Sequence, residues 1–431
     1  MSIYNYEQAF GDWDKTTAAM RKAIEEWFSM YFETEADGQQ DPCQRIAYTV
    51  VTKIVRTAFG EYKLTGETPQ ILHVVKALDS KKKEAMQLAL VGGECYIKPI
   101  LTGETFAFSL IPRNNLLIFA RDSEGMPTDV GTVEKSTRGE YYYTLLERRT
   151  VDEQGYLTIE NRLFRSRNTQ NLGTQVSLKD NAAYAHLAER YCYEQPVGSV
   201  GLVRMKTPMV NCVDGSADGV SVYAPAAGLI RNIDRNEAQL SGEFSRGESR
   251  VIVSADMLHE GELNSHLFVG LDEDPDRVGM TIFSPQLREQ SYLARKQEYL
   301  RNVESVIGLR RGTLSDANVE ERTATEITSS TGDFNLTVID FQQMWEQALH
   351  QTVALCCRLA QLYGVTLQQG QVSIDWGNGV LYDEEKTWEQ YLQMVDKGLL
   401  KPELALAWRF HMPADTEEEL LKIRKALMPS Q

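Results

Sequence analysis

The sequence predicts an α+β fold, and three stretches with different periodicities support this prediction. Residues 10–90 repeat apolar side chains with the helical period, whereas residues 94–167 alternate and are rich in β-branched and aromatic residues. Residues 286–364 return to the helical period and predict two long helices around a polar loop. At 431 residues the chain is long enough for two or three domains with their own cores.

Composition and charge narrow the class of protein. The chain has 42% hydrophobic and 25% charged residues, as ordinary soluble proteins do, and its formal net charge is −16. Tight binding to nucleic acid needs a basic stripe, and a chain this acidic would overall repel a polyanion. A sequence-specific DNA-binding protein is therefore disfavoured. The basic run Lys81–Lys83 is interpreted as a solvated helix face.

The sequence carries no pattern of membrane insertion or secretion. Its apolar runs fall short of the roughly 20 residues that cross a bilayer, and its N-terminus lacks the basic and apolar regions of a secretory signal. The six cysteines include no C-x-x-C pair, which indicates reduced thiols in a cytoplasmic protein. We expect the adjacent Cys356 and Cys357 to pack in a core, with a vicinal redox pair as the alternative.

Residues 10–90 are predicted to form three helices, at about 12–32, at 41–64 and from 69 onward through the lysine run. The second and third each begin with a capping residue followed by proline, Asp41-Pro42 and Thr68-Pro69. The apolar face expected on the first helix is Trp13, Met20, Ile24, Trp27 and Tyr31.

At Gly92-Gly93 the period changes from 3.6 to 2, and an antiparallel, strongly curved β module is expected to follow. Its clearest hairpin joins 141–149 to 156–164, with Gly155 in the turn, where a positive φ is needed. The other segments expected up to residue 222 are strands at 96–100 and 116–120 and a helical piece at 179–191 within an irregular stretch.

The second half of the chain is organised around residues 286–364. Its first helix places Leu293, Leu300, Val303 and Ile307 on one face. Its second helix opens with the capping-box spacing Thr323–Glu326, and its roughly 40 residues would span about 60 Å. This length is unusual for a globular enzyme and normal for an assembly scaffold. The other elements expected here are a helix at 223–244, strands at 250–254, 280–283 and 372–376, and helices at 384–397, 402–410 and 416–425.

A search for catalytic and metal-binding patterns gives no candidate site. The sequence contains no P-loop, no G-x-G-x-x-G and no G-x-S-x-G motif. The segment His259–His266 does not have the H-E-x-x-H spacing of a zinc site. The acidic run Asp272–Asp276 imitates the start of a calcium loop, but Arg277 stands where glycine is needed. We therefore expect no cofactor, no metal and no enzymatic activity.

Two quoted segments carry a family resemblance. Gly308-Leu-Arg-Arg-Gly-Thr-Leu-Ser-Asp316, followed by Arg322-Thr-Ala-Thr-Glu-Ile327, resembles the portal proteins of long-tailed (siphovirus-type) bacteriophages and prophages of Gram-positive bacteria. There a channel-lining loop runs into a long helix. Met205–Asn211, Gly219–Tyr223 and Ile374–Trp376 follow in the same order as in that family. The resemblance covers residues 200–425 well, and residues 1–199 match only in the order of their elements.

The resemblance implies a portal fold divided into named parts. The N-terminal helices and the β module would form a wing, two stem helices would cross the capsid shell, and a small α/β clip would lie between them. The implied division is 1–91 helical wing, 92–221 β-rich wing module, 222–248 first stem helix, 249–285 clip, 286–308 second stem helix, 309–322 tunnel loop, 323–364 long helix and 365–431 C-terminal wing and crown.

The resemblance also implies a function. Portal subunits, usually twelve, form a ring at one capsid vertex, through which a separate terminase motor packages DNA and through which the DNA is later ejected. The implied partners are other copies of the chain, double-stranded DNA without sequence specificity, the terminase large subunit, the major capsid and scaffolding proteins and a head–tail connector protein. The portal also nucleates capsid assembly. It resides in the virion, and in the host cytoplasm during assembly.

Three sets of candidate site residues follow from this resemblance. The tunnel loop would expose mostly acidic groups that repel phosphates, the acidic clip would meet the motor or connector, and the apolar stem faces would be covered by neighbours in the ring. The tunnel-loop residues are Asp316, Asn318, Glu320, Glu321 and Arg322. The clip residues are Glu260, Glu262, Asp272, Glu273, Asp274 and Asp276. The stem residues are Ile230, Ile233, Leu240, Leu293, Leu300 and Val303.

The main alternative is a cytoplasmic enzyme with a helical oligomerisation arm. Such an enzyme would show a concave pocket on which His, Asp or Glu side chains converge. The sequence offers no pattern that predicts such a pocket.

Overall fold

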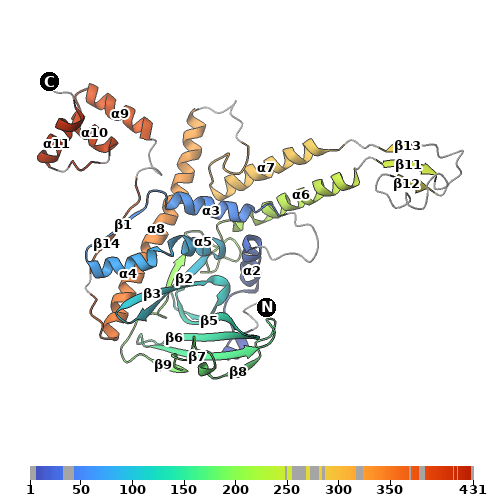
Figure 1. Cartoon of the computed structure of the whole chain (residues 1–431), viewed down its shortest axis with the longest axis vertical. Coiled ribbons are helices and arrows are strands. Elements are labelled where there is room, and N and C mark those ends of the chain that lie inside the picture. The colour runs from blue at the N-terminus through green and yellow to red at the C-terminus, as the bar shows by residue number, and fades with distance from the viewer. Residues whose placement is uncertain are drawn as a thin grey trace.

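The computed structural model of the chain is a mixed α/β body from which a long helical arm projects (Figure 1). It describes residues 6–32, 43–247, 250–254, 268–271, 281–283, 287–316, 324–367, 370–377, 384–410, 412–414 and 416–428. The C-terminal helices form a small unit on the other side of the body from the arm in this view (Figure 1). Helices and strands fall in separate stretches of the chain, in agreement with the predicted α+β class. None of the described helices is long and apolar enough to cross a membrane.

The N-terminal helices are shorter than predicted. They are α1 (Glu7–Phe10), α2 (Ala18–Phe32), α3 (Ile46–Ala58), α4 (Pro69–Asp79) and α5 (Lys82–Gly92). Thr68 caps α4 as predicted, because its hydroxyl accepts a hydrogen bond from the N–H of Ile71 at 3.3 Å. The other predicted cap, Asp41-Pro42, lies outside the described residues.

Two predicted helix boundaries are wrong because distant segments compete for the same residues. Before α2, the carboxylate of Asp14 accepts a hydrogen bond from the N–H of Ile118 at 2.8 Å, which holds this segment against the β module. Trp13 is consequently 67% exposed rather than part of a core. The second predicted helix ends at Ala58, because Leu64 lies in strand β1 (Lys63–Gly66) and pairs with Ile374 of β14 (Val372–Asp375).

The β module consists of two antiparallel sheets. A three-stranded sheet has the order β10-β2-β3, with β2 Glu94–Thr102, β3 Thr105–Pro112 and β10 Val203–Lys206. A six-stranded sheet contains β4 Leu116–Arg121, β5 Pro127–Arg138, β6 Tyr141–Val151, β7 Leu157–Ser166, β8 Thr174–Val176 and β9 Arg190–Cys192. The predicted hairpin is confirmed: β6 pairs with β7, and Gly155 in the turn has a φ of +86°.

The helical piece predicted at 179–191 is wrong. A single 3₁₀ turn at Leu178–Asp180 is followed by turns and by strand β9. The reason is that this segment is hydrogen-bonded to β7. The side-chain amide of Asn161 donates to the carbonyl of Ala188 at 2.8 Å, and the backbone N–H of Asn161 donates to the carbonyl of Glu189 at 2.8 Å.

The second half follows the predicted order of elements closely. After a 3₁₀ turn at Ala224–Ala226 come α6 (Ala227–Arg246), β11 (Arg250–Ser254), β12 (Phe268–Leu271), β13 (Thr281–Phe283), α7 (Glu289–Ile307), α8 (Ala324–Leu362), β14, α9 (Glu384–Asp396), α10 (Pro402–Arg409) and α11 (Glu417–Leu427). Strand β12 was not predicted; it pairs in parallel with β11 inside a segment that resembles an acidic loop in sequence.

The main core joins the N-terminal helices to α8. Trp345 of α8 is fully buried, and its ring meets Phe59 edge-on at 5.9 Å between centroids. Phe59 in turn contacts Tyr62 and Trp376, so that α3, α8 and the end of β14 share one aromatic cluster. Cys356 lies in this core as predicted, and burial raises the pKa of its thiol, which therefore stays protonated.

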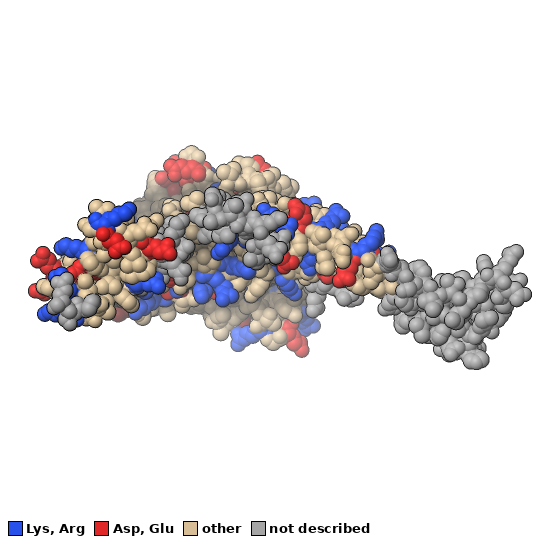
Figure 2. All heavy atoms as spheres, turned by 90° about the horizontal axis from the view of Figure 1, so that it is seen from above, with Lys and Arg blue, Asp and Glu red and all other residues tan. Residues whose placement is uncertain are grey.

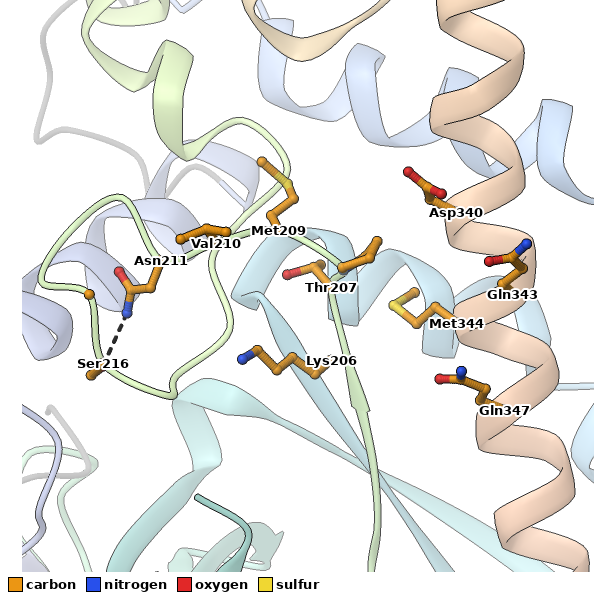
Figure 3. A pocket seen from close by; sticks show the side chains of 12 residues that line it. Lys206, Thr207, Met209, Val210, Asn211, Ser216, Asp340, Gln343, Met344 and Gln347 are labelled. Carbon is orange, nitrogen blue, oxygen red and sulfur yellow. Dashed lines mark hydrogen bonds between the residues drawn. The ribbon is translucent and has the colours of Figure 1, made fainter. Parts of the chain in front are cut away.

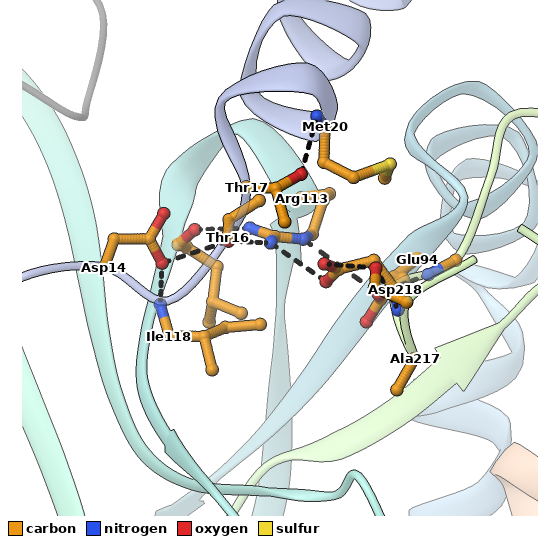
Figure 4. A network of polar contacts seen from close by, with 12 residues as sticks. Asp14, Thr16, Thr17, Met20, Glu94, Arg113, Ile118, Ala217 and Asp218 are labelled. Atoms are coloured by element: carbon orange, nitrogen blue, oxygen red, sulfur yellow. Dashed lines mark hydrogen bonds and ion pairs between the residues drawn. The ribbon is translucent and has the colours of Figure 1, made fainter. Parts of the chain in front are cut away.

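A buried network of charges joins the two sheets and the N-terminal segment (Figure 4). The carboxylate of Glu94 accepts hydrogen bonds from the Arg204 guanidinium at 2.7 and 3.0 Å. Arg113, which is fully buried, pairs with Asp218 at 3.2 Å and donates to the carbonyl of Leu116 at 2.7 Å. Burial alone would raise the pKa of Glu94, but the guanidiniums of Arg204 and Arg113 outweigh it and hold that pKa well below its usual range.

A second buried carboxylate, Glu147, links the sheets farther along. It accepts hydrogen bonds from Lys98 Nζ at 2.6 and 2.8 Å and from Arg149 Nε at 2.6 Å. Burial would raise the pKa of Glu147, yet Arg149 and Lys98 lower it to about 2. Glu147 therefore stabilises the fold above its unfolded pKa of about 4.5, and this stabilisation is lost as the pH falls toward 2.

The substitution Glu147→Gln is expected to destabilise the chain by about 3 kcal/mol at neutral pH, because two buried cations lose their carboxylate. Urea unfolding followed by circular dichroism measures this difference. The variant is also expected to lose less stability than the wild type between about pH 4.5 and pH 2. Glu153→Gln, at an exposed turn, is the matched control and should change neither quantity. Equal stability of both variants at pH 7 would contradict the assigned role of Glu147.

Candidate functional site

The projecting arm consists of α6 and α7, which run antiparallel (Figure 1). The expectation that the apolar faces of these helices need neighbouring subunits to cover them is wrong for most of the predicted stem residues. The two helices pack on each other and on the body, so one subunit already buries these side chains. The buried ones are Ile230, Ile233, Leu240, Leu300 and Val303. Leu293 differs, because it is 45% exposed on the outer part of the arm.

Polar contacts fix the register of the arm. The side-chain amide of Asn236, which is buried, donates to the backbone carbonyl of Tyr292 at 3.1 Å. Farther out, the Arg288 guanidinium binds the Glu243 carboxylate at 2.9 and 3.1 Å, and this contact lowers the pKa of Glu243 to about 2. A polar group buried between two helices stabilises one register over a shifted one, because only one register satisfies it.

The tip of the arm carries a small sheet with the strand order β12-β11-β13. The predicted clip residues Glu260, Glu262, Asp272, Glu273, Asp274 and Asp276 lie outside the described residues. Their contact with a motor or connector therefore stays a prediction.

The base of the arm ends in a tight turn that one buried carboxylate organises. Helix α7 ends at Gly308, whose φ of +78° suits glycine. Glu304, in the last turn of α7, is only 1% exposed. Its carboxylate accepts hydrogen bonds from the backbone N–H groups of Gly312 at 3.2 Å, Leu314 at 2.5 Å and Ser315 at 2.9 Å. The Ser315 hydroxyl adds a fourth bond at 2.8 Å. We call residues 308–316 the anchored turn.

Three helices hold the anchored turn in place. Lys53 of α3 donates from Nζ to the carbonyl of Thr313 at 2.7 Å. Gln297 of α7 accepts from the N–H of Asp316 at 2.8 Å. A Cβ atom at Gly308 would lie 2.8 Å from the hydroxyl oxygen of Thr337, so glycine lets the end of α7 approach α8 closely. The chain therefore leaves α7 in a fixed direction.

Among the predicted tunnel-loop residues whose side chains were singled out, the structure describes Asp316, which is exposed at the end of the anchored turn. Asn318, Glu320, Glu321 and Arg322, and the side chains of the predicted capping box Thr323–Glu326, lie outside the described residues. The structure describes the chain as far as Asp316 and again from Ala324, where α8 begins.

Glu304 is the residue of this region that the sequence analysis did not single out, although the sequence contained a signal for it. At 100° per residue, Glu304 falls about 20° from Leu293, at the edge of the apolar stripe. A carboxylate at the edge of an apolar face needs hydrogen-bond donors when it is buried. The glycines and small residues that follow in the sequence supply them as free backbone N–H groups.

A groove of about 590 Å³ lies between α8 and the loop that follows β10 (Figure 3). Its titratable lining groups are Lys206 and Asp340, and the rest of its polar lining is largely amide side chains. Its lining residues include Met209, Val210, Asn211, Gln343, Met344 and Gln347. The described residues contain no group of three or more His, Cys, Asp or Glu side chains that could hold a metal ion. The groove thus lacks the convergent acids and histidines that the enzyme alternative requires.

A projecting two-helix arm, a small sheet at its tip and an anchored turn leading into a long helix are features of a subunit built for a larger assembly. The sequence profile of the family described as phage portal protein, SPP1 Gp6-like, matches residues 93–427. The chain belongs to this family of phage portal proteins, and the resemblance to portals of long-tailed phages is confirmed. None of the curated proteins compared with the chain matches it significantly.

Membership of the family carries general properties. Portal proteins are structural, non-enzymatic components of the phage capsid that work as oligomeric rings and interact with the capsid and with DNA. The mixed helical and strand content of the chain agrees with a portal fold.

The substitution Glu304→Gln tests the anchored turn. The amide keeps the shape of the side chain but offers one acceptor oxygen in place of two, so part of the backbone donor set is left unpaired. We expect a loss of about 2 kcal/mol in unfolding free energy. Hydrogen exchange should quicken at the amides of Gly312, Leu314 and Ser315 and stay unchanged in the β module. Glu298→Gln, on the exposed side of the same helix, is the control. Unchanged exchange at these three amides would contradict the anchor role.

Proposed function

We propose that this chain forms a ring of about twelve subunits at one vertex of a phage capsid, with a central channel for DNA. The observation that carries this proposal is the family match over residues 93–427. The order of the elements along the chain also supports the proposal. The arm is followed by the anchored turn and then by the long helix, and in a portal the stem is followed by the tunnel loop and then by the channel helix. In this function a separate terminase motor drives DNA in, and the same channel releases it at ejection.

The proposed division of the chain follows its elements. Residues 1–91 and 92–221 are assigned to the wing, 222–248 and 286–308 to the two stem helices, and 249–285 to the clip. The tunnel loop is 309–322, the long helix 323–364, and the C-terminal wing and crown 365–431. Helices α6 and α7 begin and end within five residues of the proposed stem boundaries, which supports this assignment.

The proposed partners meet different parts of the ring. The acidic clip contacts the terminase large subunit during packaging and a head–tail connector afterwards. The outer surface of the wing contacts the major capsid and scaffolding proteins and so nucleates capsid assembly. The subunits assemble in the host cytoplasm and remain in the virion. Leu293, exposed on the arm, is proposed to pack against a neighbouring arm.

A mostly acidic tunnel loop suits the movement of DNA. Non-specific affinity for DNA rises steeply with the number of phosphates that cations neutralise. In residues 313–322 of this loop, Asp316, Glu320 and Glu321 repel phosphates, whereas Arg322 supplies one cation per subunit. The wall therefore guides DNA without holding it.

Electron microscopy of the purified chain tests the ring. We expect closed rings with a central hole, because heterologous contacts that close give cyclic assemblies. A strict monomer at high protein concentration, in both low and high salt, would contradict the proposal.

The double substitution Glu320→Lys and Glu321→Lys tests the low-friction wall. We expect rings to form normally but packaging to slow or fail, because each subunit gains four units of positive charge where DNA passes. The measurement is the amount of DNA that particles protect from nuclease, with electron microscopy of the rings alongside it. Glu124→Lys with Glu153→Lys, both exposed in the β module, makes the same change of charge elsewhere and should package normally. Normal packaging by the loop variant would refute the argument.

A further inference from the structure

We propose that one exposed face of α3, together with the anchored turn, contacts the phosphate backbone of double-stranded DNA in the channel. The inference rests on the proposed function, because a ring with a channel is what brings a duplex to this face. We call the surface the basic face. Its members are Arg45, Lys53, Arg56 and Arg310.

The basic face lies on a stretch without carboxylates of its own, in a chain that is strongly acidic overall; at its N-terminal end Asp234 of α6 accepts a hydrogen bond from the N–H of Gln44 at 2.8 Å. All four cations are exposed, and no Asp or Glu occurs between Cys43 and Gly60. Lys53 and Arg56 follow Arg45 by eight and eleven positions, so the three fall within a sector of about 80° around the helix. In a chain with a net charge of −16, such a segment free of carboxylates is a local exception.

The hydrogen bond from Lys53 to Thr313 brings the anchored turn against α3 and so adds Arg310 to the surface. The Glu304 carboxylate is buried and occupied by backbone donors of the turn. Asp316 is exposed at the end of the turn, on the side where its N–H donates to Gln297 of α7 at 2.8 Å. Figure 2 views the molecule from above, and Lys and Arg side chains gather near the middle of that view.

Arg45 is unusual both in its backbone conformation and in its charge at the start of a helix. It precedes the first residue of α3 with a φ of +55°, and it is the one non-glycine residue with a positive φ in the described part of the chain. This conformation costs an ordinary residue energy, and a cation at a helix N-terminus opposes the helix dipole. Asn, Asp or Ser would satisfy this position better. Arg45 thus places a cation at the exposed start of α3 in spite of this local cost.

The chemistry of the basic face fits DNA better than a protein partner. A stable protein interface has an apolar core, and here the half-buried Thr49 lies beside the cations, with its hydroxyl donating to the carbonyl of Arg45 at 2.9 Å. The nearby ring of Tyr48 already packs on Tyr31, 5.6 Å away between centroids. Arginine, lysine and threonine are the residue types that contact phosphates in protein–DNA complexes. With few cations per subunit, the contact is too weak to stop DNA and strong enough to centre it.

Purified rings of the double variant Arg56→Gln with Arg310→Gln test the inference. This variant leaves Lys53 in place, so the anchored turn keeps its contact with α3. The probe is a fluorescent linear duplex, and its affinity is measured by anisotropy between 50 and 200 mM salt. The control Lys76→Gln with Lys83→Gln removes two exposed lysines elsewhere, and both variants change the net charge from −16 to −18.

We expect the affinity of the basic-face variant for the linear duplex to fall at least about tenfold at 50 mM salt. Its salt dependence should flatten by roughly 0.9 for each phosphate that the variant no longer neutralises. The control should match the wild type. A closed circular duplex, which cannot thread a ring, should bind all three proteins equally.

Two results would overturn the inference while leaving the proposed function intact. In one, the basic-face variant binds the linear duplex as the control does. In the other, its rings dissociate at salt concentrations that the control survives, while intact rings bind DNA normally; the basic face would then be a contact between subunits. If the wild type forms no rings, or its rings bind no linear duplex, the proposed function fails together with the inference.

Discussion

The buried pairing of Glu94 with Arg204 and Arg113 is the contact on which the rest of the structure depends. Glu94 begins β2 directly after α5, and its carboxylate also accepts a hydrogen bond from the N–H of Gly219 at 2.7 Å. A buried carboxylate without its cations is strongly destabilising, so these strands and the loop that carries Gly219 must meet in one arrangement. Gly93 and Gly219 have no Cβ atoms, and their backbones touch where any larger residue would clash.

This arrangement also sets the direction of the arm. Just after Gly219, the backbone of Val222 donates to the carbonyl of Leu90 at 2.9 Å, and the hydroxyl of Tyr223 donates to Trp27 at 2.7 Å. Helix α6 starts within four residues of these contacts. At the other end of the arm, Glu304 performs a similar task with backbone donors instead of cations. Both roots of the arm are therefore fixed by buried carboxylates, which salt screens far less than it screens exposed ion pairs.

Elements that depend on neighbouring residues could be predicted from the sequence, whereas elements that depend on contacts with distant segments could not. The β6–β7 hairpin follows from alternation and from one glycine, Gly155, and the cap at Thr68 follows from its neighbours. By contrast, Leu64 fits a helical pattern, and only its pairing with Ile374 from the far end of the chain makes it a strand residue. The stem residues were correctly recognised as apolar faces, but periodicity alone does not say whether the same chain or a neighbour covers them. Glu304 was overlooked because a helical pattern counts apolar positions and ignores a single acid among them.

The net charge of the chain does not exclude local contacts with DNA, although it argues against tight binding of DNA by the molecule as a whole. A charge of −16 argues against tight binding to DNA, since a polyanion and an acidic protein repel each other. That repulsion acts on average, whereas phosphates respond to charges within about a Debye length, roughly 8 Å in physiological salt. A few cations on α3 can therefore act on a duplex although the whole molecule is acidic. In the proposed channel the two signs are complementary: acidic groups keep the duplex from adhering, and a few repeated cations hold it near the axis.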